Sequence, residues 1–124
     1  MKVFVLAVLV LAVTFGVIGW WSWYVERLSG NLLDILEKLP EEEGQLVSFG
    51  VGYESFRKHW ERGEIMLHIF VGHDAADRVE ELLEEMGMRY IGKDMAGYMT
   101  VREILVLQIQ KIRTGDKVAV DSIL

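Results

Sequence analysis

The sequence predicts an all-α protein in which an N-terminal transmembrane helix continues into a small antiparallel helical bundle. Three observations support this prediction: an apolar N-terminal segment, four segments with apolar residues at helical spacing, and short turn signals between them. A chain of 124 residues has room for a membrane segment and one small domain. We place the anchor at residues 1–25 and the domain at residues 26–124.

The N-terminal segment has the length and composition of a membrane span. Val3 to Gly19 contains no charged residue, and four aromatic residues follow at Trp20, Trp21, Trp23 and Tyr24. A helix rises ~1.5 Å per residue, so residues 3–24 would extend ~33 Å, close to the hydrocarbon thickness of a bilayer. Trp and Tyr favour the membrane–water boundary. We therefore predict that residues 3–24 cross the lipid bilayer and that these four aromatic residues lie at its interface.

A cleaved signal peptide is the alternative for this segment. The apolar region of a signal peptide spans ~7–15 residues and ends in small residues. The segment here is longer, and the aromatic cluster after Gly19 is better explained by a retained anchor. We therefore predict that the segment stays in the mature protein.

The charges beside the anchor predict its orientation. Lys2 is the only charged side chain before Glu26, and acidic residues outnumber basic ones after that point. Because positively charged flanks stay in the cytoplasm, we expect a cytoplasmic N-terminus. The domain would then be extracytoplasmic, at the surface of the cell membrane.

The membrane helix is expected to continue into the domain. Apolar residues three and four positions apart recur at Leu28, Leu32, Ile35 and Leu39. The residue before a proline avoids helical geometry, so Pro40 is expected to end this helix. Residues 41–43, all Glu, would then lie in the first turn of the next helix, where the helix dipole favours negative charge.

The second segment allows two interpretations. Apolar and aromatic residues at the spacing of one helix face occur at Leu46, Phe49, Tyr53, Phe56 and Trp60. Residues 47–53 also alternate as in a strand, and residues 65–71 are rich in residues that suit strands. The length of the first pattern favours a helix. The alternative is a small α/β domain after the anchor.

Two further helices complete the predicted bundle. Asp74 and Asp94 are expected to cap them, and Gly87 or Gly92 to end the first of the two. Their apolar faces consist of Val79, Leu82, Leu83 and Met86, and of Tyr98, Val101, Leu105, Ile109 and Ile112. We expect residues 114–116 to end the last helix and the tail over residues 117–124 to pack on the bundle.

Six residues and a C-terminal tripeptide occur in a characteristic order. They are Trp60, His73, Asp77, Tyr90, Asp94 and Glu103, followed by Ser122-Ile123-Leu124. Over essentially the whole chain this order resembles a family of short bacterial membrane-anchored proteins, domain of unknown function 4363. Ser122 stands where that family has Asn, and this chain has more glycine than expected. The resemblance implies a signal anchor with a helical domain and implies no activity.

Composition excludes several classes of function. The chain has a net charge of −6, so we expect no nucleic-acid partner. It contains no cysteine, which excludes disulfides, thiolate metal sites and thiol nucleophiles. The acidic residues at positions 80, 81, 84 and 85 are typical of a solvated helix face.

Histidine and carboxylate residues at helical spacing form the strongest candidate for chemistry. His73 and Asp77 lie four positions apart, as do Glu64 and His68. Residues at this spacing share a helix face, so they could meet at one Zn²⁺-type ion. Asp74 and Asp77 also suit a helix N-terminus, where carboxylates are common. We therefore assign no metal or other cofactor. The alternative function is a membrane-tethered metal-binding or sensing module that uses His68, His73 and Asp77.

The predicted function is that of a non-catalytic, single-pass membrane accessory protein that contacts another protein or a second copy of itself. No nucleophile, oxyanion donor or phosphate-binding loop accompanies the histidines, so we predict that the protein is not an enzyme. The small residues Ser48, Gly52 and Ser55 would let a partner helix approach closely. Packing within the bundle is the alternative for this face.

Overall fold

The computed structural model describes the backbone of residues 1–123 and the side chains in that range except Phe70 and residues 115–123. It contains four helices: α1 (Lys2–Glu37), α2 (Leu46–Phe70), α3 (His73–Ile91) and α4 (Met95–Ile123). Residues 1–123 contain no strand. The predicted all-α fold is therefore confirmed, and the alternative α/β domain is wrong.

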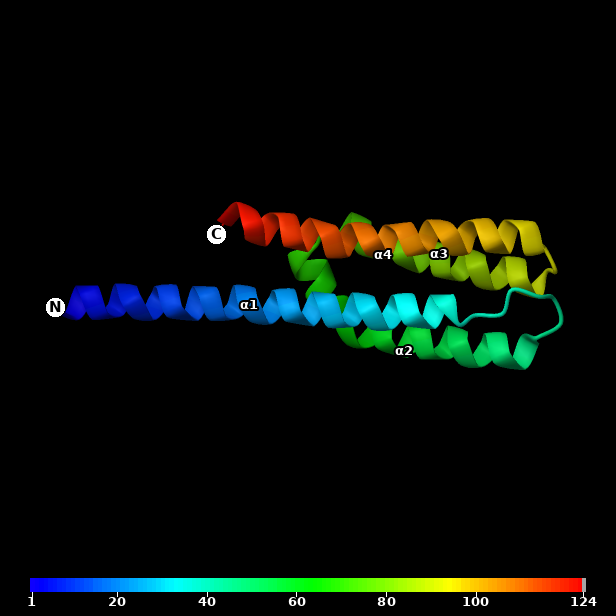
Figure 1. Ribbon diagram of the computed structural model, residues 1–124, viewed down its shortest axis with the longest axis horizontal. Coiled ribbons are helices and arrows are strands. Elements are labelled where there is room, and N and C mark those ends of the chain that lie inside the picture. The colour runs from blue at the N-terminus through cyan, green and yellow to red at the C-terminus, as the bar shows by residue number, and fades with distance from the viewer. Residues whose placement is uncertain (124) are drawn as a thin grey trace.

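The four helices form an antiparallel bundle (Figure 1). α1 packs against α2 and α4, and α3 packs against the same two helices. The N-terminal part of α1 extends beyond the ends of the other three helices. α1 is also long and apolar enough to cross a membrane. One continuous helix therefore supplies both the candidate membrane span and a quarter of the bundle.

α1 changes character along its length. The side chains of residues 1–17 are all exposed. Burial begins near the middle of the helix and recurs every three or four residues, at Trp21, Val25, Leu28, Leu32 and Leu36. This spacing keeps the buried side chains on one face, so the second half of α1 is an ordinary amphipathic bundle helix.

The predicted apolar faces of the third and last helices are confirmed in full. The buried residues include Val79, Leu82, Leu83 and Met86 in α3, and Tyr98, Val101, Leu105, Ile109 and Ile112 in α4. In α2 the prediction holds for Phe49, Phe56 and Trp60. Leu46 is instead 58% exposed and Tyr53 is only half-buried, because both line an open groove.

Three helix boundaries differ from the prediction. α2 begins at Leu46, so residues 41–43 lie in the connection before it. Gly72 precedes α3 with a φ of 113°, and Asp74 lies in the first turn instead of capping it. α4 continues through residues 114–116 to Ile123, since a single helical glycine costs only ~1 kcal/mol. The predicted packing of the tail and the Ser122-Ile123-Leu124 match concern side chains outside the described set.

Two buried tyrosines hold the connection between α1 and α2. The hydroxyl of Tyr98 donates to the carbonyl oxygen of Pro40 at 2.9 Å. The hydroxyl of Tyr90 donates to the carbonyl oxygen of Glu42 at 3.0 Å. The ring of Phe49 stacks on that of Tyr90, with 4.1 Å between centroids. The end of the bundle away from the N-terminus is therefore closed by packed rings whose hydroxyls bind the connecting backbone.

Gly63 allows α2 to approach α1 closely. A Cβ atom at this position would lie 2.7 Å from Cδ2 of Leu28 and 3.0 Å from the hydroxyl oxygen of Tyr24. At Gly50, also within α2, a Cβ atom would meet no described atom of a neighbouring segment within 4 Å. Neither glycine interrupts the helix, and only Gly63 is required by packing between helices.

Gly63→Ala is expected to be less stable than Gly50→Ala. Both substitutions gain ~1 kcal/mol of helix propensity. At position 63 the added methyl group must displace Leu28, and overpacking of this kind costs ~1–3 kcal/mol. Thermal unfolding of the detergent-solubilised protein, followed by circular dichroism, compares the two variants. A higher unfolding midpoint for Gly63→Ala than for Gly50→Ala would contradict this account of the α1–α2 contact.

Asp94 caps α4, as predicted. Its Oδ1 accepts a hydrogen bond from the backbone N–H of Gly97 at 3.0 Å, and its Oδ2 lies 2.6 Å from Nη1 of Arg89. The hydrogen bond from Gly97, and then the interaction with Arg89, lower the pKa of this carboxyl group. The ionised form of Asp94 therefore stabilises the start of α4.

This cap makes stability depend on pH. The pKa of Asp94 is lower in the folded chain than in the unfolded chain, so its stabilisation is present above the unfolded pKa and is lost as pH falls through the folded pKa. Asp94→Ala should lower the unfolding midpoint at neutral pH, and its difference from the parent should shrink on acidification. Unfolding measured over a pH series checks this. A difference that stays constant down to strongly acidic pH would show that the charge of Asp94 is unimportant.

Candidate functional site

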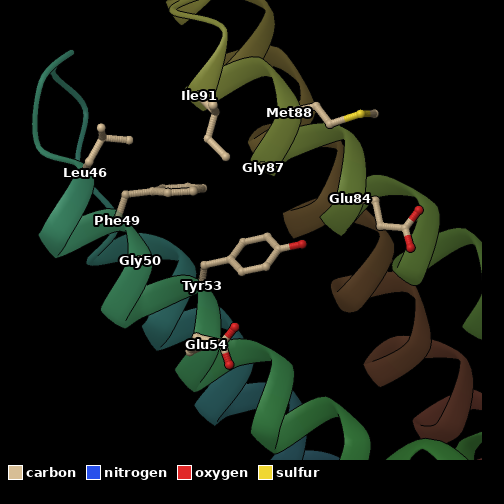
Figure 2. Close-up of a pocket in the computed structure, with 9 residues that line it drawn as sticks. All are labelled: Leu46, Phe49, Gly50, Tyr53, Glu54, Glu84, Gly87, Met88 and Ile91. Atoms are coloured by element: carbon tan, nitrogen blue, oxygen red, sulfur yellow. The ribbon is translucent and has the colours of Figure 1, made fainter.

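An apolar groove lies between α2 and α3 (Figure 2). Its lining residues belong to the start of α2 and the end of α3, which lie at the end of the bundle away from the N-terminus (Figure 1). Its volume is about 500 Å³, and it is lined by Leu46, Phe49, Gly50, Tyr53, Glu54, Glu84, Gly87, Met88 and Ile91. Met88 and Ile91 are 67% and 69% exposed. Large apolar side chains therefore remain open to solvent on both walls of the groove.

Gly87 on α3 lines the groove and leaves room for the ring of Tyr53. A Cβ atom at Gly87 would lie 3.0 Å from Cε2 of Tyr53, so the missing side chain lets the Tyr53 ring lie against α3. Figure 2 shows this ring pointing from α2 towards α3. Burial, and then the negative charge of Glu84, raise the pKa of the Tyr53 hydroxyl. Val47 and Val51, also on α2, are exposed as well and do not line the groove.

One end of the groove is acidic. Glu54 and Glu84 line it from the two facing helices (Figure 2). Arg57 lies 3.8 Å from Glu54 and compensates part of this charge. An apolar ligand that carries a positive charge at one end would match this surface.

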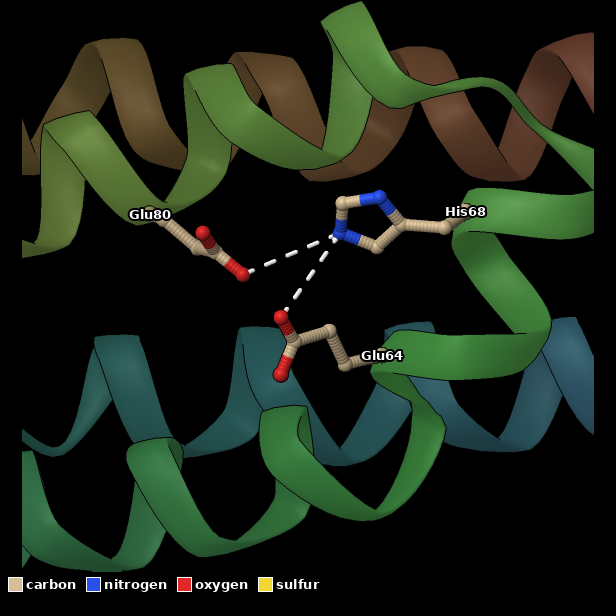
Figure 3. Close-up of side chains that lie close together, drawn as sticks. All are labelled: Glu64, His68 and Glu80. Atoms are coloured by element: carbon tan, nitrogen blue, oxygen red, sulfur yellow. Dashed lines mark ion pairs between the residues drawn. The ribbon is translucent and has the colours of Figure 1, made fainter.

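A polar cluster lies between the same two helices, at the other end of α2 (Figure 3). Nε2 of His68 is 3.7 Å from Oε1 of Glu64 and 3.9 Å from Oε1 of Glu80. The three potential ligand atoms lie within 4.8 Å of one another. The Nε2 atom is buried and has no hydrogen-bond partner among the described residues. The cluster thus contains an unsatisfied nitrogen that faces two carboxyl groups.

Neighbouring side chains orient this cluster. Nδ1 of His68 lies 2.8 Å from Nδ1 of His73, so one of the two nitrogens donates a hydrogen bond to the other. Nε1–H of Trp60 donates to Oε1 of Glu80 at 3.2 Å. The hydrogen bond to Glu80, then burial, and then the charge of Glu80 raise the pKa of Glu64. Two carboxyl groups are thus held close together beside an imidazole.

The structure brings together some of the predicted metal candidates. His68 and His73 are in contact, and Glu64 approaches His68 as their spacing predicted. Asp77 is exposed on α3 and does not belong to the group of three potential ligands. Glu80 completes that group, although the sequence placed it on a solvated acidic face. Nothing in the sequence pairs position 80 with positions 60 and 64 of α2, because Glu80 meets them only when α3 packs on α2.

The predicted interfacial aromatic residues divide between two environments. Trp20 and Trp23 are exposed, Tyr24 is partly buried, and Trp21 is 8% exposed within the bundle core. The guanidinium carbon of Arg27 lies 5.2 Å from the centroid of the Trp23 ring. Of these four residues, only Trp20 and Trp23 are therefore exposed, at 48% and 56%.

The three small residues predicted to form a contact face on α2 lie in different environments. A Cβ atom at Gly52 would lie 2.5 Å from Cδ2 of Leu39, so this glycine packs within the bundle. Ser48 is exposed, and Ser55 is partly buried with its carbonyl oxygen 2.8 Å from Nδ1 of His59. The sequence did not single out the groove beside this face. The apolar Leu46 followed one turn later by the small Gly50 was the sequence signal that could have indicated it.

Comparisons with known proteins give no information about function. No family model matches this chain, no curated protein matches it, and no solved structure matches it. The resemblance to domain of unknown function 4363 stays a prediction. The groove and the polar cluster are therefore interpreted from their own geometry.

Proposed function

We propose that this protein is a non-catalytic, single-pass membrane accessory protein whose helical bundle binds another protein through the α2–α3 groove. The N-terminus lies in the cytoplasm, the N-terminal half of α1 stays in the cell membrane, and the bundle lies outside. The observation that carries the proposal is the groove itself, with apolar side chains exposed on both walls.

The exposed half of α1 supports membrane anchoring. The apolar side chains of residues 3–17 are exposed in the part of the chain that the structure describes. Burial of apolar surface is worth ~25 cal/mol per Å², so a lipid environment stabilises this half of the helix strongly. The exposed rings of Trp20 and Trp23 follow it, at the position where an interfacial belt is expected.

The end of α2 supports a bundle held against the membrane surface. Ile65 and Ile69 lie one turn apart and are 73% and 67% exposed. They follow Gly63, whose Cβ position faces Tyr24, the last residue of the proposed span in α1. Exposed isoleucines close to the end of the proposed span are explained if this end of the bundle lies against the lipid headgroup region.

The groove fits an amphipathic helix with basic residues near one end. Its apolar walls suit the apolar face of such a helix, which is a common mode of peptide recognition. Glu54 and Glu84 would face the basic residues. A second copy of this chain is a poor occupant, because the chain has a net charge of −6 and acidic groups line the groove. The partner is therefore a different, more basic protein.

Photocrosslinking in native membranes tests this proposal. A photoreactive amino acid at Ile91, in the groove, should give an adduct with another protein, whose mass differs from that of a dimer. The same amino acid at Thr100, which is exposed on α4, is the control and should give no such adduct. Recovery of monomer alone from the Ile91 variant would refute the groove as a binding surface.

Charge reversal provides the second arm of this test. Glu84→Lys should weaken the Ile91 adduct, because it places a positive charge at the acidic end of the groove. Glu81→Lys, on the exposed side of α3, introduces the same charge away from the groove and should leave the adduct unchanged. Equal loss in both variants would show that only the overall charge matters.

A further inference from the structure

The polar cluster at the end of α2 has the composition of a transition-metal site. It offers one imidazole nitrogen and two carboxylate oxygens, from His68, Glu64 and Glu80. Zn²⁺ and related ions bind such nitrogen and oxygen sets, whereas Ca²⁺ prefers six to eight oxygen ligands. The donor set therefore selects an ion of the Zn²⁺ class.

The distances in the cluster are close to those that coordination requires. Two ligand atoms ~2.1 Å from Zn²⁺ at a tetrahedral angle are ~3.4 Å apart. The two separations from Nε2 of His68 are 3.7 and 3.9 Å. They are too long for hydrogen bonds, which leaves the buried Nε2 atom unsatisfied. Small side-chain rotations would bring all three atoms to one ion.

The residues around the cluster supply the support that a metal site needs. A ligating histidine normally directs its second ring nitrogen to a hydrogen-bond partner, and Nδ1 of His68 has His73 at 2.8 Å. Trp60 holds Oε1 of Glu80 by a hydrogen bond of 3.2 Å. Two of the three ligands are therefore oriented by neighbours that are not ligands themselves.

An open cavity gives an ion access to the cluster. The cavity has a volume of about 240 Å³, and its lining includes both carboxylates of the cluster, two further acidic residues, Glu61 and Glu84, and one cationic residue, Arg57. Acidic side chains around an entrance raise the local concentration of cations. The ion can therefore enter from solvent between α2 and α3.

We propose that Glu64, His68 and Glu80 bind one divalent ion of the Zn²⁺ class. The ion joins α2 to α3, because two ligands come from α2 and one from α3. His73 is a positioning residue that fixes the orientation of the His68 ring. The open coordination position faces the cavity and is filled by water.

Zinc titration of the full-length protein in detergent micelles, after removal of metal with a chelator, tests this proposal. Calorimetry should give one Zn²⁺ per chain. The unfolding midpoint should rise by about 5 °C or more at a free Zn²⁺ concentration of ~100 Kd. Ca²⁺ at the same concentration should leave the midpoint unchanged. Failure to bind Zn²⁺, or an equal response to both ions, would overturn the proposal.

Glu80→Gln isolates the site without disrupting the fold. The amide oxygen still accepts from Trp60, and the amide N–H can donate to Glu64, so the metal-free variant should unfold at or above the parent midpoint. Its affinity for Zn²⁺ should fall about tenfold or more. Glu81→Gln, at the next and exposed position, is the matched control and should bind Zn²⁺ like the parent. Unchanged affinity in Glu80→Gln would refute the site.

Discussion

The continuity of α1 determines how the rest of the structure is arranged. A single helix from Lys2 to Glu37 leaves the proposed membrane span and enters the bundle without a turn. Its buried face starts at Trp21, so the bundle begins where the exposed apolar segment ends. The second half of α1 packs against α2 and α4, and α3 packs against the same two helices. This packing sets the positions of both candidate sites, which lie between α2 and α3.

The two candidate sites share one interface but lie at different distances from the proposed membrane. The groove uses the start of α2 and the end of α3, whereas the polar cluster uses the end of α2 and the first half of α3 (Figures 2 and 3). Tyr53 and Glu84 line both the groove and the cavity that leads to the cluster. A change in the separation of α2 and α3 would therefore alter both sites.

Local patterns predicted the helices better than they predicted the sites. The periodic apolar residues of α3 and α4 identified those helices and their buried faces, because helical spacing is a local property. The helix start at Asp94 was also predicted, since its cap bonds to the nearby Gly97. Glu80 and the groove were missed, because they depend on how α3 packs against α2. Trp21 shows the same limit, since its burial depends on helices far along the chain.

The absence of cysteine allows one direct test of the anchored bundle. A single cysteine at Glu103, exposed on α4, can be labelled in intact cells with a membrane-impermeant maleimide. The account predicts a labelled band in the membrane fraction at the full-length mass of 14.2 kDa. A labelled but shorter product in the soluble fraction would show that the N-terminal segment is cleaved. Labelling only after the cells are permeabilised would place the bundle in the cytoplasm, and either result would contradict the account.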